Sequence, residues 1–496
     1  MLKDFDFNQV DHPFLDKKTK ELGEELDKLQ RELQAANIPM LILIDGWESS
    51  GKGYVLNEFT REMDPRYVRV EVFEEETDLE AKHPSAWRYW QKIPSKQEVV
   101  LYDRSFYYQV FNYAKQSKEK LEQKTKELIS FEQTLIDDGM LVIKFFLNIK
   151  EDTQADRIKD LEQSKYRQYL LSKEDYQQKK NYKDYQKRFE KVLDATNLED
   201  SPWHLINAED KKSAAKEVMG MSIEIIKAYL DQKSNDDKKT QTHERSYQAK
   251  HQILAGYDLT RSVSEEDYEA QKDALQERAA ELVYECYTKE IPVVLAFEGV
   301  DAAGKGGAIR RLTRQIDPRS YKIYGIKAPS PEELAHHYLW RFKTKFPQDG
   351  LMSIFDRSWY GRVLVERIEG FASEQEWERA YDEINTMEKV LSDHGTVVIK
   401  FFLYIDKDEQ AQRFKDREEE ADKNYKITEE DWRNRDKWDQ YMLAFEEMLD
   451  RTNTDHAPWK VIASNDKYFA RLEVLKEFIK EVQQHLDKHK EKDKKK

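Results

Sequence analysis

Short apolar segments alternate along the chain with long, heavily charged stretches. An apolar run of about four to eight residues is typical of a strand that is buried on both faces. In the second half of the chain this pattern predicts strands at Val293–Phe297, Tyr321–Ile326, Met352–Phe355, Val397–Tyr404 and Lys460–Ala463, with helices between them. Alternating strands and helices predict an α/β fold, in which helices cover both faces of a parallel sheet.

The same pattern occurs twice. Val142–Leu147 and Val398–Leu403 both read VIKFFL, and the motif Asp103–Ser105 recurs as Asp356–Ser358. The offset is 253 residues for the earlier motifs and 256 for the later ones. A shared period of about 250 residues indicates a duplicated domain, because the units of a solenoid are only roughly 20–50 residues long.

The repeat predicts two domains, residues 1–231 and 247–487. Residues 232–246 are polar and lack periodicity, which predicts a linker or an extended surface arm. Residues 488–496 are mostly lysine, and we expect a frayed, charged tail there.

A glycine-rich loop follows the first apolar run of each domain. The pattern G-x-x-x-x-G-K spans Gly46–Lys52 and Gly299–Lys305, and each copy precedes a helix-like stretch. Such a loop turns backbone N–H groups around phosphate oxygens, and its lysine adds a positive charge. In the second domain the expected phosphate contacts are Lys305, Gly299, Gly304, Gly306 and Gly307.

The second loop departs from the ordinary nucleotide-binding loop, in which Ser or Thr follows the lysine and binds Mg²⁺. Gly306 stands there instead, and the loop carries an acid of its own, Asp301. Because Mg²⁺ prefers carboxylate and phosphate oxygens, Asp301 and Asp356 are the predicted metal ligands, and Arg357 is expected to grip a phosphate oxygen. The alternatives are a turn residue at Asp301 and a strand-end ion pair at Asp356 and Arg357.

Charge points to a polyanionic substrate. The window Lys305–Arg367 has 13 Lys or Arg and 6 Asp or Glu, whereas the aligned window Lys52–Ala114 has 9 and 11. The net charge of +7 in the window Lys305–Arg367, within a chain of net charge −15, is what a site for phosphate chains requires. The charged stretch from Arg413 to Trp438 predicts a helix–loop–helix lid that closes over phosphates, although taken alone such a stretch is more often a solvated helix face.

The overall acidity argues against general binding to nucleic acid or anionic membranes. A single cysteine, Cys286, excludes an intramolecular disulfide and is expected to be a packed core thiol in a reducing compartment. The chain starts without a basic-then-apolar signal, and no apolar run approaches the roughly 20 residues that span a bilayer. We therefore expect a soluble, cytoplasmic protein.

The motifs Gly299–Gly307, Asp356–Tyr360 and the arginine-rich stretch from Arg413 resemble those of the family 2 polyphosphate kinases. Ala335–Arg341 with Tyr360–Arg367 looks like the fused two-domain class, and the resemblance covers essentially the whole chain. It implies two tandem P-loop kinase-like domains, each a parallel sheet flanked by helices with a helical lid. It also implies a Mg²⁺-dependent polyphosphate:AMP phosphotransferase whose second domain is the active one.

Substitutions in the first domain are consistent with that division, because each removes a phosphate ligand or crowds the loop. At the positions of Asp301, Gly307, Arg310 and Arg362 the first domain has Glu48, Tyr54, Asn57 and Gln109, and in the lid Arg417, Lys426 and Arg433 become Leu161, Leu170 and Gln177. The implied phosphate-binding set of the second domain is therefore Arg310, Arg341, Arg362, Lys426 and Arg433, besides the glycines. The first domain is expected to be mostly structural and to pair with the second like a pseudo-dimer, with residual anion binding left open.

The expected reaction is a direct in-line transfer of phosphate from inorganic polyphosphate to AMP. Lys305, Mg²⁺ and the lid arginines Arg413 and Arg417 would neutralise the transferring group, and Asp301 would orient the acceptor or its metal. A nucleotide kinase with an NTP donor, ADP as the acceptor, and a non-catalytic polyphosphate-binding protein remain alternatives. The sequence leaves open the base and chain-length preference, the physiological direction and the assembly, a homodimer included.

Overall fold

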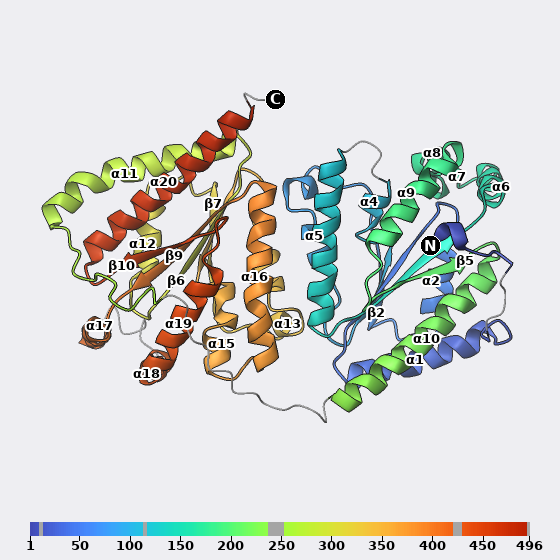
Figure 1. Cartoon of the computed structure of the whole chain (residues 1–496), viewed down its shortest axis with the longest axis horizontal. Helices are drawn as coiled ribbons and strands as arrows, with labels where there is room; N and C mark the ends of the chain where they lie inside the picture. The colour runs from blue at the N-terminus through green and yellow to red at the C-terminus, as the bar shows by residue number, and fades with distance from the viewer. Residues whose placement is uncertain (9–12, 113–116, 237–251, 420–428, 494–496) are drawn as a thin grey trace. The chain divides into compact units, whose positions relative to one another are not determined.

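The computed structural model describes residues 1–8, 13–112, 117–236, 252–419 and 429–493. The chain forms two compact units. The first comprises Met1–Thr77, Ser85–Gln241 and Pro331–His337, and the second comprises Asp78–Pro84, Thr242–Ser330 and Tyr338–Lys496. Each unit is built around one sheet with helices on both of its faces (Figure 1).

The sheet of the first half contains β1 (Met40–Gly46), β2 (Val68–Val72), β3 (Val99–Asp103), β4 (Leu141–Asn148) and β5 (Trp203–Asn207). Its helices are α1 (Thr19–Ala35), α2 (Lys52–Thr60), α3 (Trp87–Trp90), α4 (Tyr108–Asn112), α5 (Lys118–Asp137), α6 (Glu151–Glu162), α7 (Arg167–Leu170), α8 (Lys173–Lys180), α9 (Tyr182–Ala195) and α10 (Lys211–Asp236), with short 3₁₀ turns η1 (Leu2–Asp4) and η2 (Glu80–Lys82).

The sheet of the second half contains β6 (Val293–Gly299), β7 (Tyr321–Gly325), β8 (Met352–Asp356), β9 (Val397–Tyr404) and β10 (Trp459–Ala463). Its helices are α11 (Glu265–Thr288), α12 (Lys305–Leu312), α13 (Pro331–Leu334), α14 (Trp340–Lys343), α15 (Val365–Ile368), α16 (Glu374–His394), α17 (Lys407–Glu419), α18 (Glu429–Asp436), α19 (Trp438–Thr452) and α20 (Lys467–Asp493), with the 3₁₀ turn η3 (Trp359–Arg362).

The two sheets share one topology. Their strand orders are β2-β3-β1-β4-β5 and β7-β8-β6-β9-β10, and every strand pair is parallel. The first strand of each half lies in the middle of its sheet, which explains why β6 is buried along its whole length while the edge strand β7 is partly exposed. The prediction of a parallel α/β fold, made from the apolar runs, is confirmed.

In the second half, helices α11, α12 and α20 pack on one face of the sheet, and α16 and α19 pack on the other (Figure 1). Their apolar faces and the strands form one continuous core. Cys286 lies in that core, where burial raises the pKa of its thiol to about 12. This agrees with the packed thiol expected from the sequence.

The topology places the glycine-rich loop beside the Asp-Arg-Ser motif. The loop leaves the end of β6, and β8 is the neighbouring strand, with Phe297 paired to Asp356 in the register. Because parallel strands end at the same edge, both motifs lie at that edge. There β6 has β8 on one side and β9 on the other, so the strand order changes direction at β6. Phosphate sites in α/β proteins are built at such points.

Two boundary predictions differ from the structure. Helix α10 continues to Asp236, five residues into the segment predicted as a linker, and α20 continues to Asp493, well into the predicted frayed tail. Lysine and glutamate are good helix formers even without apolar periodicity, and Lys490 in the tail is paired with Glu285 at 3.1 Å and with Asp487 at 3.8 Å. In the part of the chain that the structure describes, no helix is long and apolar enough to cross a membrane.

Candidate active site

The glycine-rich loop of the second half closes tightly against the neighbouring strand. Gly299 has a φ of 136°, and a β-carbon there would lie 2.1 Å from the carbonyl oxygen of Leu403 on β9. Gly304, with a φ of 103°, sits in the left-handed region and caps α12. Gly299 is thus required for strand packing and Gly304 for the turn into the helix, whereas a β-carbon at Gly307 would meet no atom within 4 Å. Gly307 therefore leaves the surface of the loop open.

The loop lysine lies over its own loop. The Nζ atom of Lys305 donates hydrogen bonds to the carbonyl oxygens of Gly299 at 2.8 Å and Val300 at 3.4 Å. These contacts fix the ammonium group at the start of α12, where the helix dipole also favours an anion. This is the position expected for a phosphate-binding lysine.

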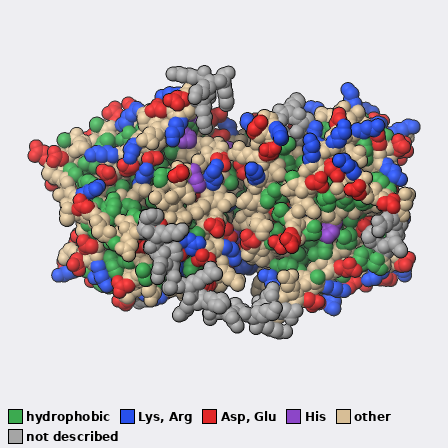
Figure 2. Space-filling model, viewed as in Figure 1, with side chains coloured by type: hydrophobic (Ala, Val, Ile, Leu, Met, Phe, Trp, Pro, Cys, Tyr) green, Lys and Arg blue, Asp and Glu red, His purple; other side chains and the backbone are tan. Residues whose placement is uncertain are grey.

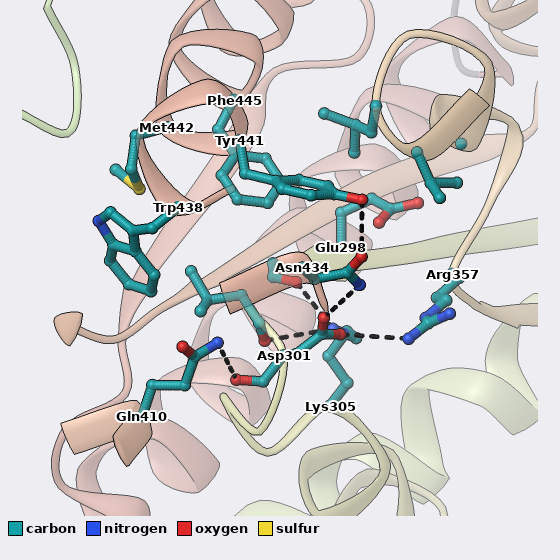
Figure 3. Close-up of a pocket in the computed structure, with 15 residues that line it drawn as sticks. Glu298, Asp301, Lys305, Arg357, Gln410, Asn434, Trp438, Tyr441, Met442 and Phe445 are labelled. Carbon is teal, nitrogen blue, oxygen red and sulfur yellow. Dashed lines mark hydrogen bonds and ion pairs between the residues drawn. The ribbon is translucent and has the colours of Figure 1, made fainter. Parts of the chain in front are cut away.

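Asp301 is the centre of a polar network that three distant segments supply (Figure 3). Its carboxylate accepts hydrogen bonds from Arg357 at 3.1 Å and from Nδ2 of Asn434 at 2.8 Å, and its main-chain oxygen accepts from Gln410 at 3.3 Å. Tyr441 in turn donates to Oδ1 of Asn434 at 3.0 Å. The Asp301 side chain is only 15% exposed, so Asp301 is more than a solvent-facing turn residue.

The Asp-Arg turn after β8 is strained. Arg357 has a φ of 62°, in the left-handed region that non-glycine residues rarely adopt, and Arg104 in the first half has a φ of 66°. Buried Glu298 holds this turn, because its carboxylate accepts from both the main-chain N and the Oγ of Ser358 at 2.7 Å. Burial raises the pKa of Glu298, although Lys305 opposes that shift. In the sequence, the sign of this role is an acid directly after an apolar run.

Asp356 faces the start of α12. A β-carbon built on Gly306 would lie 3.7 Å from its Oδ2, an ordinary contact distance, so the carboxylate lies beside the first turn of the helix. Within the described residues, no group of three or more His, Cys, Asp or Glu side chains could hold a metal ion by itself. Asp301 and Asp356 therefore fit a hard divalent cation only if phosphate oxygens complete its ligands, which is how Mg²⁺ is usually held.

These groups line a cavity of about 880 Å³. Its walls combine the loop from Asp301 to Gly307 with Asp356, Arg357, Arg341, Arg417 and Arg433. The structure thus brings together the predicted residues of the loop, the Asp-Arg motif and the part of the lid that is described.

A second cavity, of about 370 Å³, shares loop residues with the first and is strongly basic. Its charged lining residues are Arg311, Arg413, Arg417, Lys467, Arg471 and Asp416. Burial and the nearby Arg311 both lower the pKa of Arg471, which means that like charges are held together there. The sequence analysis missed Arg311, Lys467 and Arg471, because only the packing of α12 against α20 shows that they share a wall.

Two of the predicted phosphate ligands, Arg310 and Arg362, are not part of these walls. Arg310 is exposed on α12 and lines none of the cavities described here; its neighbour Arg311 faces the basic cavity instead, because adjacent helical residues point about 100° apart. Arg362 pairs with Glu366 at 3.2 Å, and its guanidinium carbon lies 4.4 Å from the centre of the Tyr338 ring. Lys426 lies outside the described residues.

Arg413, predicted as a lid arginine over the transferring phosphate, is instead buried against the backbone. Its guanidinium donates to the carbonyl oxygen of Ala302 at 2.9 Å and to those of Ser464 and Asn465 beyond β10, and it pairs with Glu409. With these donors occupied, Arg413 clamps the phosphate loop to the end of the sheet. Arg157 makes the same kind of contacts in the first half, to Ser50 and Ala208 at 2.8 Å.

The equivalent site of the first half is closed by its own side chains. Glu48 is buried and accepts from Lys52 at 3.4 Å, from Arg104 at 3.2 Å and from Tyr108 at 3.2 Å. Burial would raise the pKa of Glu48, but Lys52 and Arg104 outweigh it and hold the pKa low, so the carboxylate stays ionised. The lysine that would meet a phosphate is already neutralised by a protein carboxylate.

A parallel sheet with a glycine-rich loop, its lysine and a neighbouring Asp-Arg turn at one edge defines a P-loop phosphotransferase fold. The family model for polyphosphate kinase 2 matches this chain twice, over residues 10–236 and 262–491. The chain belongs to the polyphosphate kinase 2 family, which confirms the resemblance seen in the motifs.

Several relatives match nearly end to end. The chain is 41% identical to a polyphosphate:AMP phosphotransferase of Pseudomonas aeruginosa strain PAO1, covering 95% of this chain and 96% of the relative. It is 39% identical to a polyphosphate:AMP phosphotransferase of Pseudomonas syringae pv. tomato, with 92% of each chain covered. A crystal structure described as a polyphosphate kinase 2 from Pseudomonas aeruginosa PA01 superposes with a TM-score of 0.83 at 39% identity, covering 97% of both chains.

Proposed function

We propose that the second half of this chain transfers the terminal phosphoryl group of inorganic polyphosphate to AMP and so makes ADP. The relatives that match over nine-tenths of the chain are named for this reaction. Within the chain, the observation that carries the proposal is the basic cavity beside the loop. Its residues Arg311, Arg417 and Arg471 are replaced in the first half by Glu58, Leu161 and Ala215, so the first half keeps only two of the five basic residues that favour a phosphate chain.

In the proposed reaction, an oxygen of the AMP phosphate attacks the terminal phosphorus of polyphosphate. The bond between that phosphorus and the bridging oxygen breaks, and the chain leaves one unit shorter. The polyphosphate lies in the basic cavity and the AMP phosphate in the larger one, so the reacting groups meet over Lys305. Lys305, Arg357 and Arg417 balance the charge of the transferring group, and Arg413 keeps the loop in place.

The carboxylates of Asp301 and Asp356 would hold Mg²⁺ together with phosphate oxygens, and the bound ion would neutralise charge on the transferring group. Asp301 also positions Arg357 through their 3.1 Å ion pair. The role of Asp301 therefore combines metal binding with orientation of the arginine.

The test is ADP formation from AMP, long-chain polyphosphate and Mg²⁺, with ATP in place of polyphosphate as the control donor. We expect ADP with polyphosphate only; activity with ATP alone would identify a nucleotide kinase, and binding without turnover a polyphosphate-binding protein. Asp301→Ala should lower kcat by at least about 10²-fold, because it removes a charge aimed at the transition state. The matched variant Glu48→Ala should change kcat less than about twofold, and equal loss in both would refute the assignment of the site to the second half.

A further inference from the structure

A third cavity of the second half, of about 70 Å³, opens beside the loop and is lined mainly by apolar and aromatic side chains (Figure 3). Val300, Leu364, Trp438, Tyr441 and Phe445 form its walls, with Met442 and Val365. On this scale one water needs roughly 10–15 Å³, so the cavity by itself has room for several waters. It shares Asp301, Lys305, Arg357, Gly361 and Val365 with the cavity of about 880 Å³, so a planar ligand can enter it from there. The reaction proposed above does not by itself explain a cavity of this character.

The first half shows what fits there. Trp47 is the equivalent of Val300, and its indole ring is fully buried. It stacks on Tyr182 with ring centres 3.9 Å apart and planes 5° apart, and it meets Phe189 edge-on at 4.8 Å. Tyr182 and Phe189 correspond to Trp438 and Phe445, so the same aromatic walls stand in both halves, and in the first half a bicyclic ring fills the space between them.

Three replacements open this space in the second half. Besides Trp47, which becomes Val300, Tyr108 becomes Gly361 and Phe111 becomes Leu364, and all three replacements line the cavity. Each exchange removes an aromatic ring, whereas the stacking partner is kept or enlarged, from Tyr182 to Trp438. A site that loses the filling rings but keeps the stacking wall is suited to a planar ligand.

Polar groups at the cavity floor define which planar ligand fits. Lys305, Asp301 and Arg357 line this cavity as well as the large one, so a ligand whose ring stacks on Trp438 can keep a phosphate at the loop. Asn434 donates to Asp301 and accepts from Tyr441, and the second Nδ2 hydrogen of its amide can donate to a ring nitrogen.

We propose that this cavity binds the purine base of the acceptor nucleotide, in the place that the indole of Trp47 occupies in the first half. A purine is a fused five- and six-membered ring, as is an indole, so the two have the same outline. The proposal rests on the proposed function, because it takes the acceptor to be a nucleoside monophosphate. It adds that Val300 and Trp438 determine the binding of the base.

The direct test is Val300→Trp, which restores the filling ring of the first half. We expect the KM for AMP to rise by at least about tenfold, since stacking of a base on an aromatic side chain is lost, while the KM for polyphosphate and the kcat stay within about twofold. The reciprocal variant Trp47→Val is the matched control and should leave the KM for AMP unchanged. An unchanged KM for AMP in Val300→Trp would overturn the proposal.

A second pair of variants keeps the test decisive if Val300→Trp does not fold. Trp438→Leu should raise the KM for AMP, and Trp438→Phe, which still stacks, should restore most of the affinity. In the wild-type enzyme, AMP and GMP should exceed CMP and UMP in kcat/KM by at least about tenfold, because a single ring leaves part of the cavity unfilled. Equal use of all four nucleotides, or no difference between Leu and Phe at position 438, would contradict the assignment.

Failure of the proposed function is a separate outcome. If the wild-type protein makes no ADP from polyphosphate, that function falls, and the cavity is then tested by calorimetric titration with AMP alone. Binding that is weakened by Val300→Trp but not by Trp47→Val would still support the base site, and AMP binding that is equal in wild type and Val300→Trp would overturn it.

Discussion

At the scale of single residues, the two halves differ in the groups that their loop lysines contact. Lys52 donates to the carboxylate of Glu48 as well as to the carbonyl oxygen of Trp47, whereas Lys305 donates to two neutral carbonyl oxygens. Asp301 is one methylene shorter than Glu48 and pairs with Arg357. A side chain longer by one methylene group therefore accounts for a neutralised anion site in one half and an available positive charge in the other.

The role of Arg413 also depends on single contacts, because its guanidinium donates to carbonyl oxygens of the loop and of the segment beyond β10. Arg413→Met should release the loop at Ala302 and lower kcat by about 10²-fold, since small displacements of positioning groups have effects of that size. The matched variant Arg157→Met breaks the same kind of contacts in the first half and should lower the melting temperature similarly with kcat unchanged. Steady-state kinetics together with thermal melting would check both, and an unaltered kcat in Arg413→Met would exclude the clamp.

At the scale of elements, a buried lysine in the middle of an apolar strand joins that strand to a helix in both halves. Lys400 on β9 contacts Glu388 of α16 at 2.8 Å, the Tyr360 hydroxyl at 2.9 Å and the carbonyl oxygen of Thr452 at 2.7 Å. Lys144 pairs with Glu132 in the same way. Burial lowers the pKa of both lysines against the pull of their glutamates. Because both halves keep the pair, including the half in which Glu48 neutralises the loop lysine, its role is to join helix to strand.

Removing this lysine should be costly. Lys400→Met leaves the buried Glu388 without its cation, with only the hydrogen bonds from Trp359 and Tyr360, and we expect a loss of about 3–5 kcal/mol in the free energy of unfolding of the second half. The double variant Lys400→Met with Glu388→Leu removes both charges and should recover most of that loss. Urea unfolding followed by circular dichroism would measure both; a single variant as stable as the wild type would show that the pair contributes nothing.

At the scale of the whole molecule, the local distribution of charge differs from what the negative net charge suggests. The chain carries a net charge of −15, and on the face drawn in Figure 2 acidic and basic side chains are interspersed. The positive charge that matters is concentrated around the basic cavity of the second half. An acidic protein can therefore bind a polyanion, because at distances shorter than the screening length the local electric field, and not the net charge, governs association.

This concentration predicts how salt acts on the reaction. Raising the monovalent salt from about 50 to 200 mM should increase the KM for polyphosphate by about tenfold or more, because several neutralised phosphates release their counterions together. The KM for AMP, which carries one phosphate, should change by less than about threefold. Initial rates at several salt concentrations would show this, and equal shifts for both substrates would mean that the basic cavity does not hold the chain.

The sequence predicted the strands of the second half to within one or two residues, because fully buried parallel strands are continuous apolar runs. It also predicted which residues of the loop and of the Asp-Arg motif lie together, since both follow strands of one parallel sheet. The contacts of single arginines were harder to predict. Arg310 and Arg311 are adjacent in sequence and both lie in a helix, and only the direction in which α12 presents them decides that Arg311 reaches the cavity.

The sequence by itself determined the duplication, the parallel α/β architecture, the phosphate loop and the family, since all of these are carried by local pattern and by residue identity at fixed spacing. Only the tertiary structure decided the tasks of the long polar side chains. Arg413 clamps the loop backbone, Glu48 neutralises Lys52, and the loss of three rings opens a cavity at Trp438. The physical reason is that these tasks depend on which groups from distant segments come within hydrogen-bonding or stacking distance, and that is fixed only when the helices pack on the sheet.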